Sequence, residues 1–180
     1  MPLKHSENCK ECKKRIFELL SRIFGEVELS YDLNLPTDPN AFQGNPFYRD
    51  LRTILKALQN HRGHQNFVGV KKLPRVDFFV KRPGFIVETD ESQHFTMPRK
   101  IALENYPDTL KLGFDKERWM ELCETLNRHD NDPNPYRDET RAWYETLRDF
   151  APAFLNLKPT VRIYLKDYTW CSLHLKESED

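Results

Sequence analysis

Three carboxylates lie close together in residues 75–95, and their spacing suggests a metal site. Asp77 lies in one short apolar run, and Glu88 and Asp90 lie two residues apart in the next run. Side chains alternate between the two faces of a β-strand, so Glu88 and Asp90 share a face. Carboxylates held this close need a cation or strongly raised pKa values. Oxygen ligands alone favour a hard divalent ion, Mg²⁺ or Mn²⁺.

The two apolar runs predict β-strands joined by a Pro-Gly turn, and these strands position the acids. Apolar and polar side chains alternate in each run, so one face of the hairpin should be buried. If the loop closes symmetrically around its Pro-Gly pair, Val80 faces Val87 and Asp77 faces Asp90. Opposed like charges destabilise a sheet, which again favours a bound cation. A three-residue loop would shift the pairing by one, and a solvated hairpin without metal is the alternative to a metal site.

The rest of the chain supplies helices and two further strands. Amphipathic periodicity and helix-ending residues predict helices over residues 10–24, 49–60, 98–107, 116–127 and 136–150, and strands over 27–31 and 161–165. This order predicts an α+β fold, αβββαβ-like, with a mixed central sheet flanked by helices. At 180 residues, the chain is expected to be one domain over 1–180, with a core at about 74–166 and an N-terminal helical decoration over 10–60.

The helix predicted over 136–150 has a clear two-sided pattern. Trp143, Leu147 and Phe150 are expected in the core. Its arginines and acids are expected on a solvated face, mostly as pairs four residues apart.

The acidic hairpin and its flanking elements resemble the PD-(D/E)XK nuclease superfamily, in the branch related to very-short-patch repair endonucleases. The match lies in residues 76–78 (Val-Asp-Phe) and 88–95 (Glu-Thr-Asp-Glu-Ser-Gln-His-Phe), and the resemblance covers about 74–166. It implies a restriction-endonuclease-like fold and metal-dependent hydrolysis of phosphodiester bonds. The implied partner is nucleic acid, with DNA expected, and the implied activity is that of a DNA endonuclease.

The resemblance also implies roles for single residues. Asp77 and Glu88 would hold Mg²⁺ or Mn²⁺, together with the backbone carbonyl of Thr89. Asp90 would be a further ligand or would position the attacking water. The bound ion would lower the pKa of that water and neutralise charge that develops on the phosphate.

Gln93 and His94 follow the second strand of the hairpin, and the resemblance implies that they contact the scissile phosphate. A surface or structural role is the alternative for His94. The common form of the superfamily has a Lys where this chain has Asp90, and that Lys orients or activates the attacking water. The missing cation is expected from Lys100, from Arg99 or from a second metal ion.

The charge balance gives no sign of a strongly basic nucleic-acid binder, since Lys and Arg total 28 and Asp and Glu also total 28. Basic residues nevertheless bracket the acidic strands and would suit a phosphate-binding rim: Lys71-Lys72, Arg75, Lys81-Arg82 and Arg99-Lys100. Ordinary surface charge is the alternative. The alternative function is a non-catalytic nucleic-acid-binding module with the nuclease fold or with a stabilising zinc ion.

The cysteines suggest a second, structural metal. Cys9 and Cys12 form a C-x-x-C at the start of the first predicted helix, and Cys171 and His174 form a C-x-x-H after the last strand. Together they would make a four-ligand Zn²⁺ site, and chain termini often lie close together. Semi-buried thiols without metal are the alternative. Cys123 lies on an apolar helix face and is expected in the core.

The mean hydropathy of −0.76 indicates a large charged surface. There is no apolar run long enough for a membrane span, and the first residues lack the apolar stretch of a secretory signal. A cytoplasmic protein is therefore expected, and the oligomeric state is left open.

Overall fold

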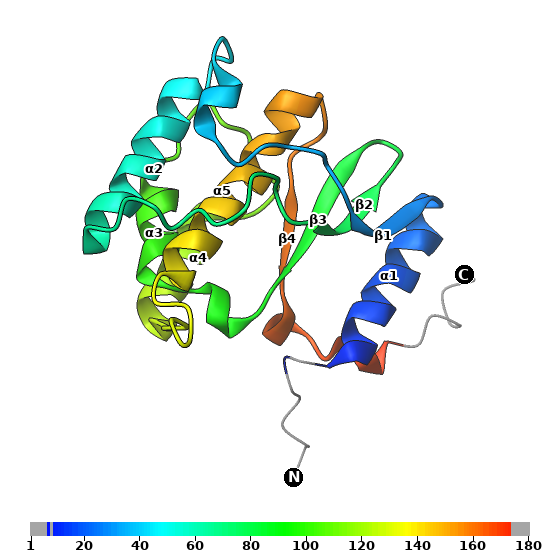
Figure 1. Ribbon diagram of the computed structural model, residues 1–180. Coiled ribbons are helices and arrows are strands. Elements are labelled where there is room, and N and C mark those ends of the chain that lie inside the picture. Colours follow the sequence, from blue (N-terminus) through cyan, green and yellow to red (C-terminus); the bar gives the residue numbers. More distant parts are fainter. Residues whose placement is uncertain (1–6, 8, 174–180) are drawn as a thin grey trace.

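A four-stranded mixed sheet forms the centre of the fold in the computed structural model, which describes residue 7 and residues 9–173 (Figure 1). The sheet order is β1-β2-β3-β4. Its strands are β1 (Val27–Tyr31), β2 (Val76–Val80), β3 (Phe85–Asp90) and β4 (Val161–Tyr164). β2 is antiparallel to β1 and β3, whereas β4 runs parallel to β3. The α+β class and the mixed sheet are thus confirmed.

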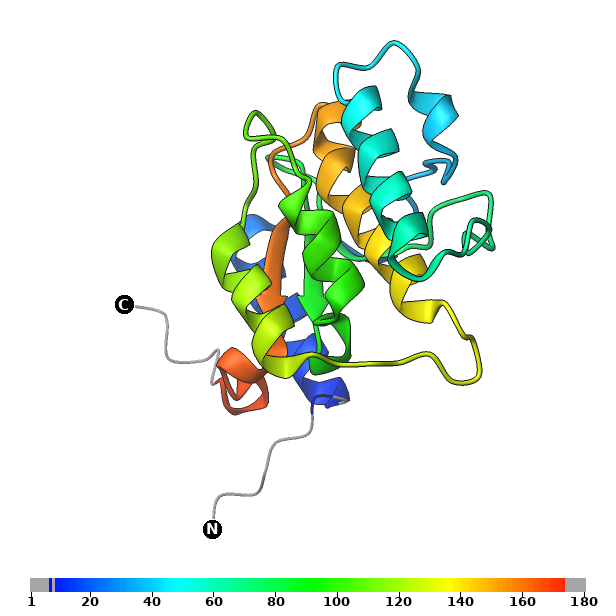
Figure 2. The ribbon, with the colours of Figure 1, turned by 90° about the vertical axis from the view of Figure 1, so that its left-hand side faces the viewer.

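Helices cover both faces of the sheet (Figures 1 and 2). One face carries α1 (Lys10–Phe24); the other carries α2 (Tyr48–Arg62), α3 (Met97–Glu104), α4 (Lys116–Leu126) and α5 (Arg137–Leu155). Every helix predicted from the sequence is present. In the described part of the chain, no helix is long and apolar enough to cross a lipid bilayer.

Two hydrophobic cores hold these layers together. On the α1 side, Ile16 and Leu20 pack against Phe78, Val80 and Val87 of the hairpin. The larger core lies on the other face and contains residues of α2, α3, α4 and α5, among them Cys123, Trp143, Leu147 and Phe150 as predicted. Residues 10–60, which the sequence predicts as a decoration, contribute α1, β1 and α2 to these two cores.

Helix α5 continues five residues beyond the predicted end, through Pro152. A proline lacks the N–H that would donate to the carbonyl four residues earlier, here that of Arg148. The hydroxyl of Thr160 donates to this carbonyl instead, at 2.8 Å. The Arg148 carbonyl is therefore satisfied. The helix ends at Leu155, and the following residue, Asn156, caps it in a left-handed backbone conformation.

The β2–β3 hairpin has a different register from the symmetric one expected. Phe78 pairs with Val87 and Val80 pairs with Phe85, so the expected Val80–Val87 pair is wrong. Residues 81–84 form a four-residue loop instead of a two-residue Pro-Gly turn. A slip of two residues keeps every side chain on the same face, so the apolar pattern alone does not distinguish these registers.

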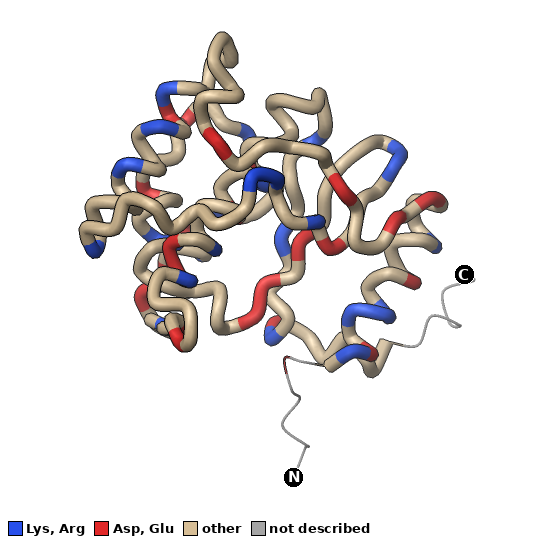
Figure 3. The backbone as a smooth tube through the Cα atoms, in the orientation of Figure 1, with Lys and Arg blue, Asp and Glu red and all other residues tan. Residues whose placement is uncertain are grey.

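The observed register changes which acids are neighbours. Continuing the pairing by one residue sets Asp77 beside Glu88, and the expected Asp77–Asp90 pair is also wrong. Acidic residues still follow β3 through the middle of the molecule (Figure 3).

Candidate active site

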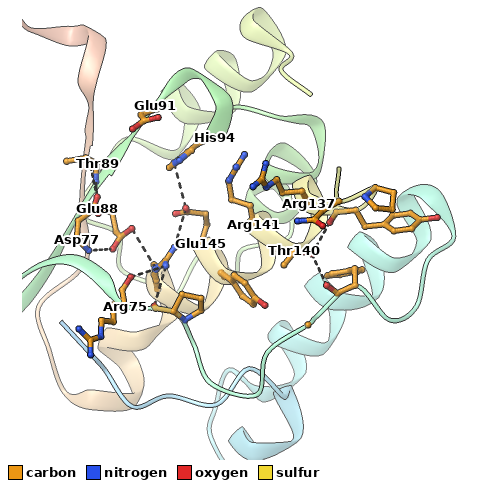
Figure 4. A pocket seen from close by; sticks show the side chains of 18 of the residues that line it. Arg75, Asp77, Glu88, Thr89, Glu91, His94, Arg137, Thr140, Arg141 and Glu145 are labelled. Carbon is orange, nitrogen blue, oxygen red and sulfur yellow. Dashed lines mark hydrogen bonds and ion pairs between the residues drawn. The ribbon is translucent and has the colours of Figure 1, made fainter. Parts of the chain in front are cut away.

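A cleft of about 770 Å³ opens beside the ends of β2 and β3. Asp77 and Glu88 line it, Lys13 approaches from α1, and α5 forms a wall. Figure 4 shows Asp77, Glu88 and Thr89 together on one side of the cleft, with the side chains of α5 on the other. The cleft therefore combines acids from the sheet with cations from two helices, α1 and α5, which lie on opposite faces of the sheet.

The carboxylates of Asp77 and Glu88 each accept a hydrogen bond from a backbone N–H of the neighbouring strand. The N–H of Asp77 donates to Glu88 Oε1 at 2.9 Å. The N–H of Thr89 donates to Asp77 Oδ2 at 2.9 Å, and the Thr89 hydroxyl donates to the same oxygen. One oxygen of each carboxylate is thus anchored.

The other oxygen of each carboxylate lies near a cation, but at a long distance. Asp77 Oδ1 lies 3.4 Å from Lys13 Nζ, and Glu88 Oε2 lies 3.7 Å from Arg148 Nε. Charge-assisted hydrogen bonds are usually about 2.7–2.9 Å long. These two oxygens are therefore held near the cleft without a short hydrogen bond to either cation.

Burial raises the pKa of Glu88 to about 7. The guanidinium of Arg148 lowers it, while the neighbouring carboxylate of Asp77 raises it further. A cation bound between the two carboxylates would offset this penalty. The pair thus has the electrostatic properties of a cation site.

Asp90 does not join this pair. Arg162 Nη1 donates to its two oxygens at 3.0 and 3.2 Å, and the Trp119 indole N–H donates at 2.8 Å. Asp77, Glu88 and Asp90 do not form a group within reach of one ion. The expected convergence of these three carboxylates is wrong, because the register sets Glu88 beside Asp77 and leaves Asp90 two residues further along β3.

Three other residues that could bind a metal ion, Asp90, His94 and Glu145, do lie within reach of one ion. Its centre already has a cation, since Arg162 Nη1 is 2.5 Å from Glu145 Oε2 and 3.0 Å from Asp90 Oδ1. Burial alone would raise the pKa of both carboxyls, but Arg162 lowers that of Asp90 far below its usual range and that of Glu145 to about 2. This group is a buried ion-pair network.

The network extends behind the site and explains the buried charges of α5. Arg162 Nε also donates to Asp149 at 2.8 Å, and Asp149 accepts from Arg99 and Tyr106 at 2.7 Å each. The expectation that the acids of α5 lie on a solvated face is wrong for all four, which are buried: Asp138, Glu139, Glu145 and Asp149.

Gln93 and His94 differ in their relation to the cleft. The exposed Gln93 amide donates to Glu91 at 2.9 Å, and Gln93 is not among the residues lining the cleft. His94 lines it, and His94 Nδ1 lies 3.0 Å from Asp90 Oδ1. Burial would lower the pKa of His94, but its contact with Asp90 raises that pKa above the usual value. His94 is thus a link between the cleft and the buried network.

The cations expected to replace the missing lysine lie elsewhere. Arg99 is buried and donates to Asp149, and Lys100 pairs with Glu104 and Glu124 at 3.1 and 2.5 Å. Lys13 is the cation next to Asp77. No local pattern marks Lys13, because 64 positions separate it from Asp77 in the sequence and only the packing of α1 brings the two together.

The basic rim also differs from the expectation. Of the bracketing residues, Arg75 lines the cleft, whereas Lys72 pairs with Asp32 and Lys81 pairs with Glu28. The cleft is instead lined by one face of α5: Arg137, Thr140, Arg141, Tyr144, Glu145 and Arg148. Their three- and four-residue spacing is visible in the sequence, but the acids between them make the helix resemble a solvated one.

The cysteine cluster is partly as expected. Ligand atoms of Cys9, Cys12 and Cys171 lie within 4.8 Å of one another. His174, the fourth residue of the predicted set, lies outside the described residues.

Comparisons of the chain with protein-family models, with curated proteins and with solved structures found no match. The function is therefore inferred from the geometry of the site itself.

Proposed function

We propose that this protein is a metal-dependent nuclease that hydrolyses phosphodiester bonds in DNA. The observation that carries the proposal is the Asp77–Glu88 pair, in which backbone N–H groups anchor one oxygen of each carboxylate and the other oxygen stays near an open cleft. A DNA-binding protein gains nothing from two acids directed at phosphate, whereas a hydrolase with a bound cation does.

The arrangement of elements supports the same proposal. The order α1, β1, α2, β2, β3, α3–α5 and β4 has antiparallel pairing through β3 and a parallel β4. Apart from the inserted α2, this order is consistent with a restriction-endonuclease-like core. The acids lie on the two central strands, as the resemblance of residues 76–78 and 88–95 implies.

Asp77 and Glu88 are the residues that would hold Mg²⁺ or Mn²⁺, with the carbonyl of Thr89 as a further oxygen ligand. The donor set fits, because it consists of oxygens only and because the buried Glu88 has a raised pKa that a cation would lower. When bound, such an ion lowers the pKa of a water molecule and offsets charge on the phosphate. Asp90 is left out of this set, since Arg162 and Trp119 occupy its oxygens.

The chain itself supplies the remaining groups. Lys13 places an ammonium group 3.4 Å from Asp77 and can orient the attacking water or the phosphate. Arg148 lies against Glu88 and favours its ionised form. Arg137 and Arg141 line the cleft and share Asp130 as a partner at 3.2 and 2.7 Å, and phosphate oxygens could replace that carboxylate.

An aromatic surface in the cleft suits nucleic acid. The rings of His64 and Tyr136 stack with centroids 3.8 Å apart and an angle of 7° between planes, and both residues line the cleft. Flat rings next to a basic wall provide a stacking surface for unpaired bases.

A plasmid-nicking assay tests the proposal. Wild-type protein should convert supercoiled DNA to the nicked form with Mg²⁺ or Mn²⁺ and should be inactive in buffer without divalent ions. Glu88→Gln should lose this activity. Glu18→Gln makes the same chemical change on the outer part of α1, where Glu18 pairs with Arg15, and should remain active. Equal nicking by wild type and Glu88→Gln would contradict the proposal.

The non-catalytic binding module is the second candidate function, and one observation favours it. Asp90 occupies the position where the superfamily usually has a Lys, and here Arg162 holds it in a buried network. A binding protein would shift labelled DNA in a gel with and without Mg²⁺ and leave the strand uncut. Cleavage in the same samples would decide for the nuclease.

A further inference from the structure

Three cysteines from the two ends of the described chain meet beside the sheet. Their ligand atoms lie within 4.8 Å of one another. A tetrahedral zinc site with Zn–S bonds of about 2.3 Å places sulfur atoms about 3.8 Å apart. The observed cluster therefore needs only small side-chain movements to hold one ion.

Local structure presents these side chains together. Cys9 is the residue before the first turn of α1, and the N–H of Cys12 donates to the carbonyl of Cys9 at 3.1 Å. This turn brings both side chains of the C-x-x-C to one side. Cys171 comes from the short 3₁₀ helix η4 (Trp170–Ser172), which packs against α1 (Figures 1 and 2).

A second contact ties the same part of the chain down independently. The carboxylate of Glu7 accepts from the N–H of Ser92 at 3.1 Å and lies 3.2 Å from Lys166 Nζ. Glu7, two residues before Cys9, is thus held near the ends of β3 and β4.

We propose that Cys9, Cys12 and Cys171 bind one zinc ion that joins the start of α1 to the C-terminal segment. Thiolates are the ligands that zinc prefers in structural sites, and such sites have four ligands. The fourth residue that the sequence predicts for this site, His174, lies outside the described residues. Zinc binding releases the thiol protons to solvent and involves no oxidation.

The zinc site would also position a residue of the cleft. Lys13 directly follows Cys12 and lies 3.4 Å from Asp77. Loss of zinc should loosen the first turn of α1 and with it the ammonium group of Lys13. This consequence rests on the proposed nuclease function, whereas zinc binding itself does not.

Metal analysis tests zinc binding directly. Full-length protein purified without metal-affinity steps in a reducing buffer should contain about one zinc ion per chain. Cys9→Ser and Cys171→Ser should lose it. Cys123→Ala, which changes the buried cysteine of α4, should keep it. Wild type without zinc, or zinc retained at full occupancy in Cys171→Ser, would overturn the proposal.

Cobalt gives a readout that does not depend on how well the variants fold. Wild type in which Co²⁺ replaces the bound ion should show the thiolate-to-cobalt charge-transfer bands and the visible bands of a tetrahedral site. Absence of the charge-transfer bands, or a disulfide among these cysteines in mass spectra of the reduced sample, would overturn the proposal.

The two proposals can fail separately. Asp77→Asn should keep its zinc while losing nicking activity. Zinc-free wild type should show nicking reduced by about tenfold or more, and added zinc should restore it. If Asp77→Asn nicks like wild type while zinc content is normal, the nuclease proposal fails and the zinc site stands.

Discussion

The backbone N–H of Asp77 donates to the carboxylate of Glu88 at 2.9 Å, which makes these two acids neighbours at the end of the β2–β3 hairpin. The burial of Glu88 and the open cleft beside Asp77 make this pair the centre of the proposed chemistry.

Magnesium should stabilise the wild-type protein through this pair. Asp77→Asn keeps an oxygen that can accept from the Thr89 N–H and removes one ligand charge, so its own stability should change little. Thermal unfolding with and without Mg²⁺ should show a rise in melting temperature for wild type and none for Asp77→Asn. An equal rise in both proteins would place the ion elsewhere.

Lys13 should matter for cleavage, and its neighbour should not. Lys13→Ala removes the ammonium group next to Asp77 and should lower the nicking rate by about 10- to 100-fold. Lys14→Ala changes the adjacent, exposed lysine of the same helix and should have no effect. Equal rates for the two variants would remove Lys13 from the mechanism.

The stability of the metal-free protein should fall as the pH rises toward neutrality. Folding raises the pKa of Glu88 from its usual 4.5 to about 7, so the folded protein keeps a proton that the unfolded chain has lost between these values. The contribution of Glu88 to stability is full below pH 4.5 and decreases by up to about 3 kcal/mol as the pH passes 7. Urea unfolding of wild type and Glu88→Gln measures this difference, and parallel pH profiles would refute it.

The buried network should be sensitive to loss of its central cation. Arg162→Met leaves Asp90, Glu145 and Asp149 without their shared guanidinium and should cost about 3–5 kcal/mol of unfolding free energy. Arg118→Met breaks an exposed pair with Asp167 and should cost less than about 1 kcal/mol. Chemical unfolding of the two variants should therefore give clearly different midpoints, and similar midpoints would contradict this account of the network.

Most secondary structure could be predicted from the sequence because periodicity and turn residues are local signals. The helices, the hairpin and the inward positions of Trp143, Leu147 and Phe150 follow from that pattern. The register of the β2–β3 hairpin could not be predicted in this way, because a slip of two residues leaves the same side chains on each face of the hairpin.

Only part of the site could be predicted from the sequence, because some of its residues have a local sequence signal and others are placed by tertiary contacts. Asp77 and Glu88 are marked by acids within apolar strands, but the position of Asp90 depends on Arg162, which lies 72 residues away in the sequence. Lys13 and the cleft-lining face of α5 depend on how helices pack on the sheet. These relationships are tertiary, and a single sequence carries no local signal for them.

Anomalous diffraction from crystals of the wild-type protein soaked in Mn²⁺ tests the central claim most directly. The account predicts a manganese peak bound by the carboxylates of Asp77 and Glu88, and no such peak in Glu88→Gln crystals. A peak at the Asp90, His94 and Glu145 group, or no peak near Asp77 in the wild type, would contradict it.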